Sequence, residues 1–139
     1  MGTARFEQLA ATLADRDRDV SKSLGSVRTE LEALRRRALG AVQAFVRVAS
    51  ERGGTHLTDI AVGPVESDEK HVDCLQFKVW RGRWELTCVG KARGVLTLVG
   101  PYRRGKPEKP CAEFMLPGAE ADAALEDRLL ALLREASAR

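Results

Sequence analysis

Residues 6–48 decide how this chain folds, and they read FEQLAATLADRDRDVSKSLGSVRTELEALRRRALGAVQAFVRV. Apolar side chains recur here in alternating steps of three and four residues, which makes a heptad repeat. One heptad position holds Phe6, Leu13, Val20, Val27, Leu34, Ala41 and Val48. The other holds Ala10, Leu24, Leu31, Ala38 and Phe45, with Asp17 as a charged intruder. A stripe with this period is typical of a helix that buries one face against another helix.

The heptad stripe predicts a homo-oligomer, most simply a dimer. Large apolar side chains left in water would each forgo about 1.5–3 kcal/mol of burial. We expect the interface to comprise Val20, Leu24, Val27, Leu31, Leu34, Ala38 and Phe45. The repeat is compatible with parallel and with antiparallel pairing.

A polar stretch at residues 15–19 raises the question of whether the arm is one helix or two. Either one helix continues through a polar layer at Asp17, or a short helix turns into a second one near Asp19. Because Asp and Ser favour helix caps over helix interiors, we expect two helices. Gly53-Gly54 then ends the helical region. The predicted organisation is therefore a helical arm over residues 1–52 and a compact domain over residues 53–139.

From residue 57 to residue 116 the apolar period changes to two, which indicates β-strands. The alternating apolar positions are Leu75, Phe77 and Val79, followed by Trp84, Leu86 and Cys88. We expect a two-residue turn at Arg81-Gly82, which would place Lys78 opposite Glu85. Further strands are expected at 60–62, 95–99 and 112–116, with a loop at 101–110. Short turns and regular alternation predict an antiparallel meander of four to five strands.

The C-terminal segment predicts an amphipathic helix. Its apolar face consists of Leu125, Leu129, Leu132, Leu133 and Ala136. Pro117-Gly118 precedes it, and acidic residues follow where a helix would start. The fold class is thus expected to be α+β, with a long helical arm, the meander, and this helix packed on the sheet.

Composition places the chain among ordinary globular proteins. Its 44% hydrophobic and 31% charged residues are typical of a folded domain and not of a disordered one. We expect no membrane span, no export signal and a cytoplasmic location. The odd set Cys74, Cys88 and Cys111 is expected to be reduced. His71 and Cys74 would project to opposite faces of a strand, so neither a metal site nor any other cofactor is expected.

Positive charge concentrates in the middle of the chain. Residues 78–110 carry nine basic and two acidic side chains, a net +7, against +3 for the whole chain. In a meander, the turn near residue 81 and the loop at 101–110 lie at the same end of the sheet. We call this the basic end, and its predicted binding residues are Trp80, Arg81, Arg83, Tyr102, Arg103, Arg104, Lys106 and Lys109. Arginine can bind phosphate or carboxylate groups, and aromatic rings can stack on bases, although solvated surface is the plainer interpretation.

No pattern in the sequence nominates catalytic residues. Neither histidine is placed to activate a cysteine, and no glycine motif that would cradle a phosphate is present. The favoured function is a non-enzymatic homo-oligomeric interaction or adaptor module. The alternative is a nucleic-acid- or anion-binding protein, with nucleic acid or an acidic protein as the partner. The salt dependence of binding distinguishes these two functions, because contacts with phosphate weaken steeply as the ionic strength rises.

Overall fold

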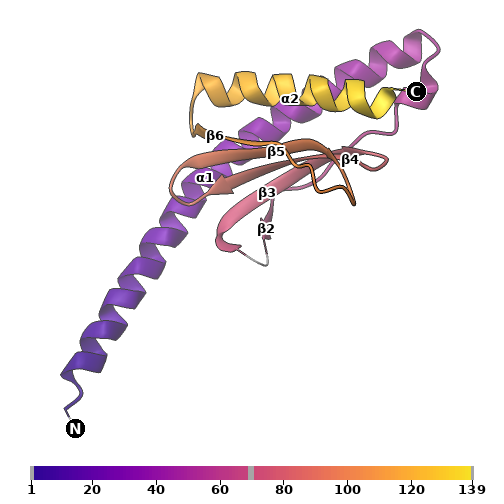
Figure 1. Ribbon diagram of the computed structural model, residues 1–139. Coiled ribbons are helices and arrows are strands. Elements are labelled where there is room, and N and C mark those ends of the chain that lie inside the picture. The colour runs from indigo at the N-terminus through magenta and orange to yellow at the C-terminus, as the bar shows by residue number, and fades with distance from the viewer. Residues whose placement is uncertain (1, 69–70, 139) are drawn as a thin grey trace.

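An antiparallel sheet carries two helices on one of its faces in the computed structural model, which describes residues 2–68 and 71–138 (Figure 1). The helices are α1 (Ala4–Glu51) and α2 (Ala119–Ser137), with a short 3-10 turn, η1 (Thr55–Leu57). The strands are β1 (Ala61–Val62), β2 (Glu66–Asp68), β3 (His71–Arg81), β4 (Trp84–Lys91), β5 (Val95–Arg103) and β6 (Cys111–Met115). The α+β class predicted from the sequence is confirmed.

The sheet is a meander in the order β1-β3-β4-β5-β6, and all its pairs are antiparallel. The short strand β2 also pairs with β3, next to β1. Each long strand therefore pairs with its neighbour in sequence, as short turns dictate. The two brief strands along β3 bring the count to six, slightly above the four to five expected.

The core lies between the sheet and the two helices. The buried side chains of the sheet are Leu75, Phe77, Val79, Leu86, Cys88, Leu96 and Leu98. The helices contribute Leu31, Leu34, Ala38 and Val42 from α1, and Ala121, Leu125, Leu129 and Leu132 from α2. Period two in the strands and the helical spacing of these residues place all of them in one layer. The core thus crosses residue 52, and the second half of α1 belongs to it.

α1 is one continuous helix of 48 residues, so the prediction of two helices is wrong. Asp17 causes no break because every residue from 2 to 19 is exposed, and a charged side chain in water carries no burial penalty. An ion pair between Arg18 and Asp15, one turn apart, adds local support. The first part of α1 consequently projects away from the sheet as a bare helix (Figure 1).

The middle of the heptad stripe packs on the chain's own sheet. Val27, Leu31, Leu34 and Ala38 are at most 4% exposed, and Leu24 packs partly buried at the edge of the core. The approach is close at β4, where a Cβ on Gly90 would lie 2.5 Å from Cγ1 of Val27. Docking on the sheet therefore starts near Leu24.

The turn between β3 and β4 is Gly82-Arg83, not the expected Arg81-Gly82. Arg81 pairs with Trp84, Val79 with Leu86 and Phe77 with Cys88, a shift of two residues that keeps the same faces. Gly82 has a φ of +58°, and the first turn position is where a tight hairpin of this kind places its glycine. Lys78 therefore lies opposite Thr87, and its Nζ reaches Glu85 only diagonally, at 3.9 Å.

β5 runs on through residues 100–103, where a loop was expected from 101. The strand register shifts between Glu85 and Thr87, so β5 carries an irregularity at Gly100-Pro101 and then pairs Tyr102 with Glu85. Proline is tolerated in a strand at such a bulge, which is why Pro101 does not end β5. This extension moves Tyr102 from the predicted loop into the sheet.

Candidate functional site

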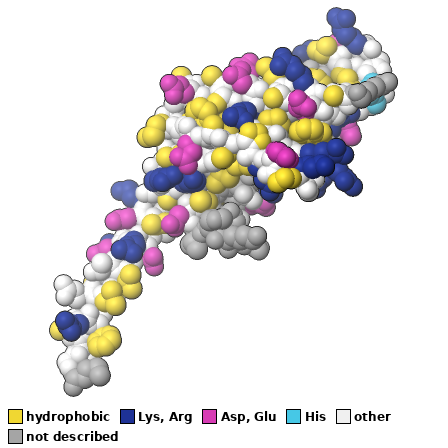
Figure 2. Space-filling view, viewed as in Figure 1, with side chains coloured by type: hydrophobic (Ala, Val, Ile, Leu, Met, Phe, Trp, Pro, Cys, Tyr) yellow, Lys and Arg dark blue, Asp and Glu magenta, His cyan; other side chains and the backbone are white. Residues whose placement is uncertain are grey.

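The residues of the basic end lie together in space but are divided between the two faces of the sheet. Arg81, Arg83, Trp84 and Arg103 line a pocket of about 290 Å³ on the helix side, beside Ala136 of α2. Trp80, Tyr102 and Lys109 belong to the open side, since Trp80 and Tyr102 each pair with Glu85. In Figure 2, Lys and Arg side chains gather over the end of the sheet where the β3–β4 turn lies. The alternation of strand faces explains the division.

Arg81 joins three parts of the fold and has little left for a ligand. Its Nε donates to Asp59 at 2.7 Å, and its terminal nitrogens donate to the carbonyl oxygens of His56 and Ala136 and to the Ser137 hydroxyl. The side chain is only 12% exposed. A guanidinium near the last carbonyls of α2 also complements the negative end of that helix. Arg81 is therefore a structural cross-link between β3, η1 and α2.

The open side holds a buried polar cluster that sequence reasoning missed. The Tyr102 hydroxyl donates to Glu85, and it lies 3.1 Å from Thr87 Oγ1. Burial and the bond to Glu85 raise the pKa of Tyr102 above its ordinary value. Lys109 Nζ lies 5.1 Å from the centre of the Tyr102 ring. The Tyr102 hydroxyl is hydrogen-bonded and Lys109 lies over the Tyr102 ring. Tyr102 is therefore a structural residue and not a surface on which a base could stack.

Three cations of the basic end remain uncommitted. The side chains of Arg83, Arg103 and Lys106 make no hydrogen bond or ion pair within residues 2–68 and 71–138. Arg104, by contrast, donates to the Gly82 carbonyl at 2.6 Å and closes the β3–β4 turn. What is left for an anion at the small pocket is the pair Arg83, which precedes Trp84 in the chain, and Arg103, which pairs with Trp84 across the strands.

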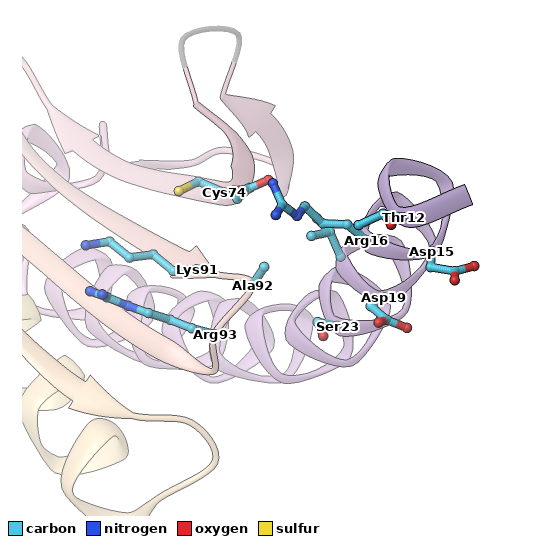
Figure 3. A pocket seen from close by; sticks show the side chains of 11 residues that line it. Thr12, Asp15, Arg16, Asp19, Ser23, Cys74, Lys91, Ala92 and Arg93 are labelled. Carbon is cyan, nitrogen blue, oxygen red and sulfur yellow. The ribbon is translucent and has the colours of Figure 1, made fainter. Parts of the chain in front are cut away.

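A hollow of about 850 Å³ forms a notch between α1 and the ends of β3 and β4. Figure 3 shows Arg16 of α1 pointing toward the strand that carries Cys74, whose side chain points away from it, with Lys91 and Arg93 on the strand side. Its lining mixes both signs of charge, and Glu113 pairs with both Lys91 and Arg93. The notch marks where α1 leaves the sheet and selects for neither an anion nor a cation.

The exposed large apolar side chains lie elsewhere, three of them on the projecting arm and the others at Val48, at Met115 of β6 and at Leu130 of α2. From here on, the arm means residues 4–19 of α1, a shorter segment than the helical arm of residues 1–52 expected from the sequence. Its Phe6, Leu9 and Leu13 are 63%, 55% and 45% exposed. Leu130 of α2 and Val48 of α1 are each 43% exposed. Figure 2 shows hydrophobic side chains along the arm and over the helical layer. Monomeric proteins rarely expose such groups in rows, so these surfaces are candidates for contact with a partner.

A groove of about 560 Å³ runs between α1 and α2 on their outward side. Its apolar lining is Ala38, Ala41 and Phe45 of α1 with Leu125, Leu129, Leu130 and Leu133 of α2. Arg37 and Asp122 form an ion pair that joins the helices at one end of it. Sequence reasoning did not foresee this groove, although Leu130, lying off the predicted apolar face of α2, was a signal.

The remaining chemistry is sparse in the described residues. They contain no disulfide, and no group of three or more His, Cys, Asp or Glu side chains in that part could hold a metal ion. Burial raises the pKa of the Cys88 thiol. The side chain of His71 lies outside the described part. Within residues 2–68 and 71–138, no helix combines the length and apolar character needed to cross a membrane.

Comparison of the chain with protein-family models, curated proteins and solved structures finds no match in any of the three. Two surfaces of the molecule are candidates for contact with a partner or a ligand. These are the arm with the helical groove, and the Arg83–Arg103 pocket.

Proposed function

We propose that this chain is a non-enzymatic homo-oligomeric interaction module, most simply a dimer, that assembles through its projecting arm. The observation that carries the proposal is the exposed row of Phe6, Leu9 and Leu13 on a helix that continues rigidly into the core. These side chains recur at steps of three and four residues, the spacing by which a helix presents anchors to a partner.

A partner would add to the stability of the arm. Its residues 4–19 form about 24 Å of helix at 1.5 Å per residue. The arm continues a docked helix and so needs no nucleation of its own, but most helix stability comes from packing an apolar face, which the arm lacks in the single chain. Burial of Phe6, Leu9 and Leu13 would contribute about 1.5–3 kcal/mol for each side chain. Self-association supplies that burial.

The proposed contact is displaced along α1 from the interface first expected. Val27, Leu31, Leu34 and Ala38 already lie in the chain's own core, whereas Phe45 is half-buried beside the groove. Opening the core to pair the middle of two stripes would expose the sheet. The contact therefore uses the arm, and Val20 and Leu24 mark where it ends.

The test is the mass of the protein in solution. Wild type at tens of micromolar should have twice the 15.2 kDa of the chain by light scattering. The variant Leu9→Asp with Leu13→Asp should be a folded monomer, because both side chains are exposed in the single chain. Ser26→Asp with Thr29→Asp, at exposed positions of α1 outside the arm, makes the same change of charge and is the control. A monomeric wild type contradicts the proposal.

A second candidate function is anion or nucleic-acid binding at the basic end. Its specific support is that Arg83 and Arg103 line one pocket and have no side-chain partner in the described ranges. Retention on heparin and affinity for short DNA and RNA at two salt concentrations test it. Arg83→Ala with Arg103→Ala should abolish salt-sensitive binding, whereas Arg28→Ala with Arg36→Ala removes equal charge elsewhere and should not. Wild-type retention equal to that of a neutral control would count against this function.

A further inference from the structure

We propose that the outer edge of β6 is a docking site for an extended segment of another protein, which adds to the sheet as a further antiparallel strand. The site uses no residue of the arm and is independent of the proposed function. β6 ends the sheet in the order β1-β3-β4-β5-β6, so one side of its backbone has no neighbouring strand. Because the free groups are backbone N–H and C=O groups at the spacing of a β-strand, the occupant that they fit is another β-strand.

Two hydrogen bonds at the ends of β6 show which of its backbone groups face β5. The Leu116 N–H donates to the Gly94 carbonyl at 2.9 Å, and the Gly100 N–H donates to the Pro110 carbonyl at 2.7 Å. Both bonds join even-numbered residues of the β6 segment to the β5 segment. Since the pairing side alternates from residue to residue along an antiparallel strand, residues 112 and 114 also direct their backbone groups to β5.

The backbone groups that face outward are consequently those of Cys111, Glu113 and Met115. The register of β6 on β5 is uninterrupted through five consecutive pairs, so the alternation holds along the whole strand. In the described ranges, no hydrogen bond reaches the N–H or C=O groups of Cys111 and Glu113 or the N–H of Met115 on this side. They form a row of unpaired donors and acceptors along the edge of the sheet.

The opposite edge of the sheet is protected against such pairing, and the β6 edge is not. β1 and β2 contain two and three residues, and the register of β2 on β3 is irregular between Ser67 and Asp68. Short and irregular edge strands discourage pairing with another chain. β6 pairs regularly, and its sequence CAEFM contains neither proline nor lysine. The two edges therefore differ in the property that decides whether a further strand can add.

The single charge of β6 is held toward the inner strands. The Glu113 carboxylate accepts from Lys91 Nζ at 3.0 Å, from Arg93 at 3.3 Å and from the Thr97 hydroxyl at 3.5 Å. A carboxylate neutralised in this way does not keep a foreign strand off the edge. Two copies of β6 paired about Glu113 would place the two carboxylates directly opposite each other, which is unfavourable. The occupant is therefore a strand of different sequence and not a second copy of β6.

β5 shows which side chains fit beside β6. On the open side it sets valine, threonine and valine against the outward residues of β6, as the pairs Val95–Met115, Thr97–Glu113 and Val99–Cys111. A strand with the same alternation on the outer edge would cover Met115, which is 68% exposed. Its intervening side chains would lie next to the partly buried Phe114 on the helix side. The partner segment is accordingly rich in β-branched residues, with a hydroxyl opposite Glu113.

A peptide with the sequence of β5 is the probe for this site. It comprises residues 94–100, GVLTLVG, with two added glutamates for solubility and with blocked ends. In an NMR titration, the amide signals of Cys111, Glu113 and Met115 should shift more than those of residues 112 and 114 and should gain protection from hydrogen exchange. An absence of shifts at millimolar peptide would overturn the proposal. Shifts of the same signals with protein concentration alone would place a second copy on the edge and would overturn it as well.

Peptides with one N-methyl group test the direction of the pairing. With the threonine opposite Glu113, the threonine N–H points to β6, whereas the N–H of the leucine before it points away. N-methylation of the threonine should weaken binding by at least about tenfold, because it removes one hydrogen bond and obstructs the edge. The same methyl group on the leucine should change the affinity by less than about twofold. Equal effects of the two methyl groups would contradict the proposal.

Two variants at one position test the edge of the protein itself. Glu113→Pro and Glu113→Ala both remove the carboxylate, but only proline removes the outward N–H. The ladder to β5 does not use that N–H, so both variants should fold, which circular dichroism checks. Glu113→Pro should bind the peptide at least about tenfold more weakly than Glu113→Ala, and equal affinities would overturn the proposal. If Glu113→Pro fails to fold, the two methylated peptides decide. The mass of either folded variant should equal that of wild type, so this result and the test of the arm are read separately.

Discussion

The two halves of α1 carry the same heptad repeat and have opposite surroundings. From Leu24 to Val42 the stripe is buried against the sheet, with Leu31 fully covered. From residue 2 to residue 19 every residue is exposed, including Phe6 and Leu13 at the same heptad position as Leu34. The comparison teaches that a heptad repeat specifies the width of an apolar stripe but not its partner. A sheet covers one half, and the other half is free for a second copy.

The largest contrast is expected between a buried leucine and an exposed leucine of α1. Leu31→Ala should lower the free energy of unfolding by about 2–5 kcal/mol, because it leaves a cavity at the centre of the core. Leu9→Ala should change the stability of the dilute, monomeric protein by less than about 0.5 kcal/mol. Urea denaturation at micromolar concentration or below measures both. Equal losses would show that the arm is part of the monomer core.

Gly90 of β4 tests how closely the second half of α1 packs on the sheet. Gly90→Ala should cost about 1–3 kcal/mol, since the new Cβ would lie 2.5 Å from Val27 Cγ1. Val27→Ala in the same chain should recover part of that loss, which a double-mutant cycle would measure. Gly40→Ala is the control, because nothing lies within 4 Å of a Cβ there and alanine favours the helix. Additive losses for Gly90 and Val27 would contradict the packing described.

The basic end shows the same contrast between engaged and free groups. Arg81→Met should lower stability by about 1–3 kcal/mol, because it leaves the Ala136 carbonyl and its neighbours without their donor. Arg83→Met, two residues along, should be within about 0.5 kcal/mol of wild type. Thermal or urea unfolding distinguishes them. A large loss at Arg83 would mean that it, too, is a structural residue.

The smallest effect expected is a pH dependence at Asp59. The hydrogen bond from Arg81 holds the pKa of this carboxyl below its usual value. A depressed folded-state pKa means that the pair stabilises the fold above about pH 4, the ordinary pKa of Asp, and loses this as pH falls through the lowered pKa. Unfolding curves between pH 2 and pH 6 should show the dependence in wild type and a weaker one in Asp59→Asn. Because Asp59 is largely exposed, the change should be slight.

Patterns of apolar residues sufficed to predict the fold class. The period of two located the meander, and the face of Leu125, Leu129 and Leu132 located α2. The break at residues 15–19 was wrong because Asp17 is in water, where a charged side chain at an apolar heptad position carries no burial penalty. The β3–β4 turn was placed early by one residue because the apolar faces remain matched in either register.

The candidate sites were harder to predict, because they depend on tertiary placement. The extension of β5 through Pro101 brought Tyr102 to Glu85, and no local signal announces such a bulge. The role of Arg81 depends on the C-terminal end of α2, far along the chain. The groove between α1 and α2 depends on the angle at which the two helices lie on the sheet. Local sequence carries none of this information.

The central claim is that the repeat is divided, with one half folded within the chain and the other shared between copies. Hydrogen–deuterium exchange along α1, measured across a hundredfold range of protein concentration, tests it most directly. Amides of residues 24–42 should be protected at every concentration. Amides of residues 6–19 should be protected at high concentration and exchange rapidly on dilution, as an unpartnered helix does. Arm protection that does not change with concentration, or a middle segment that loses protection on dilution, would contradict the account.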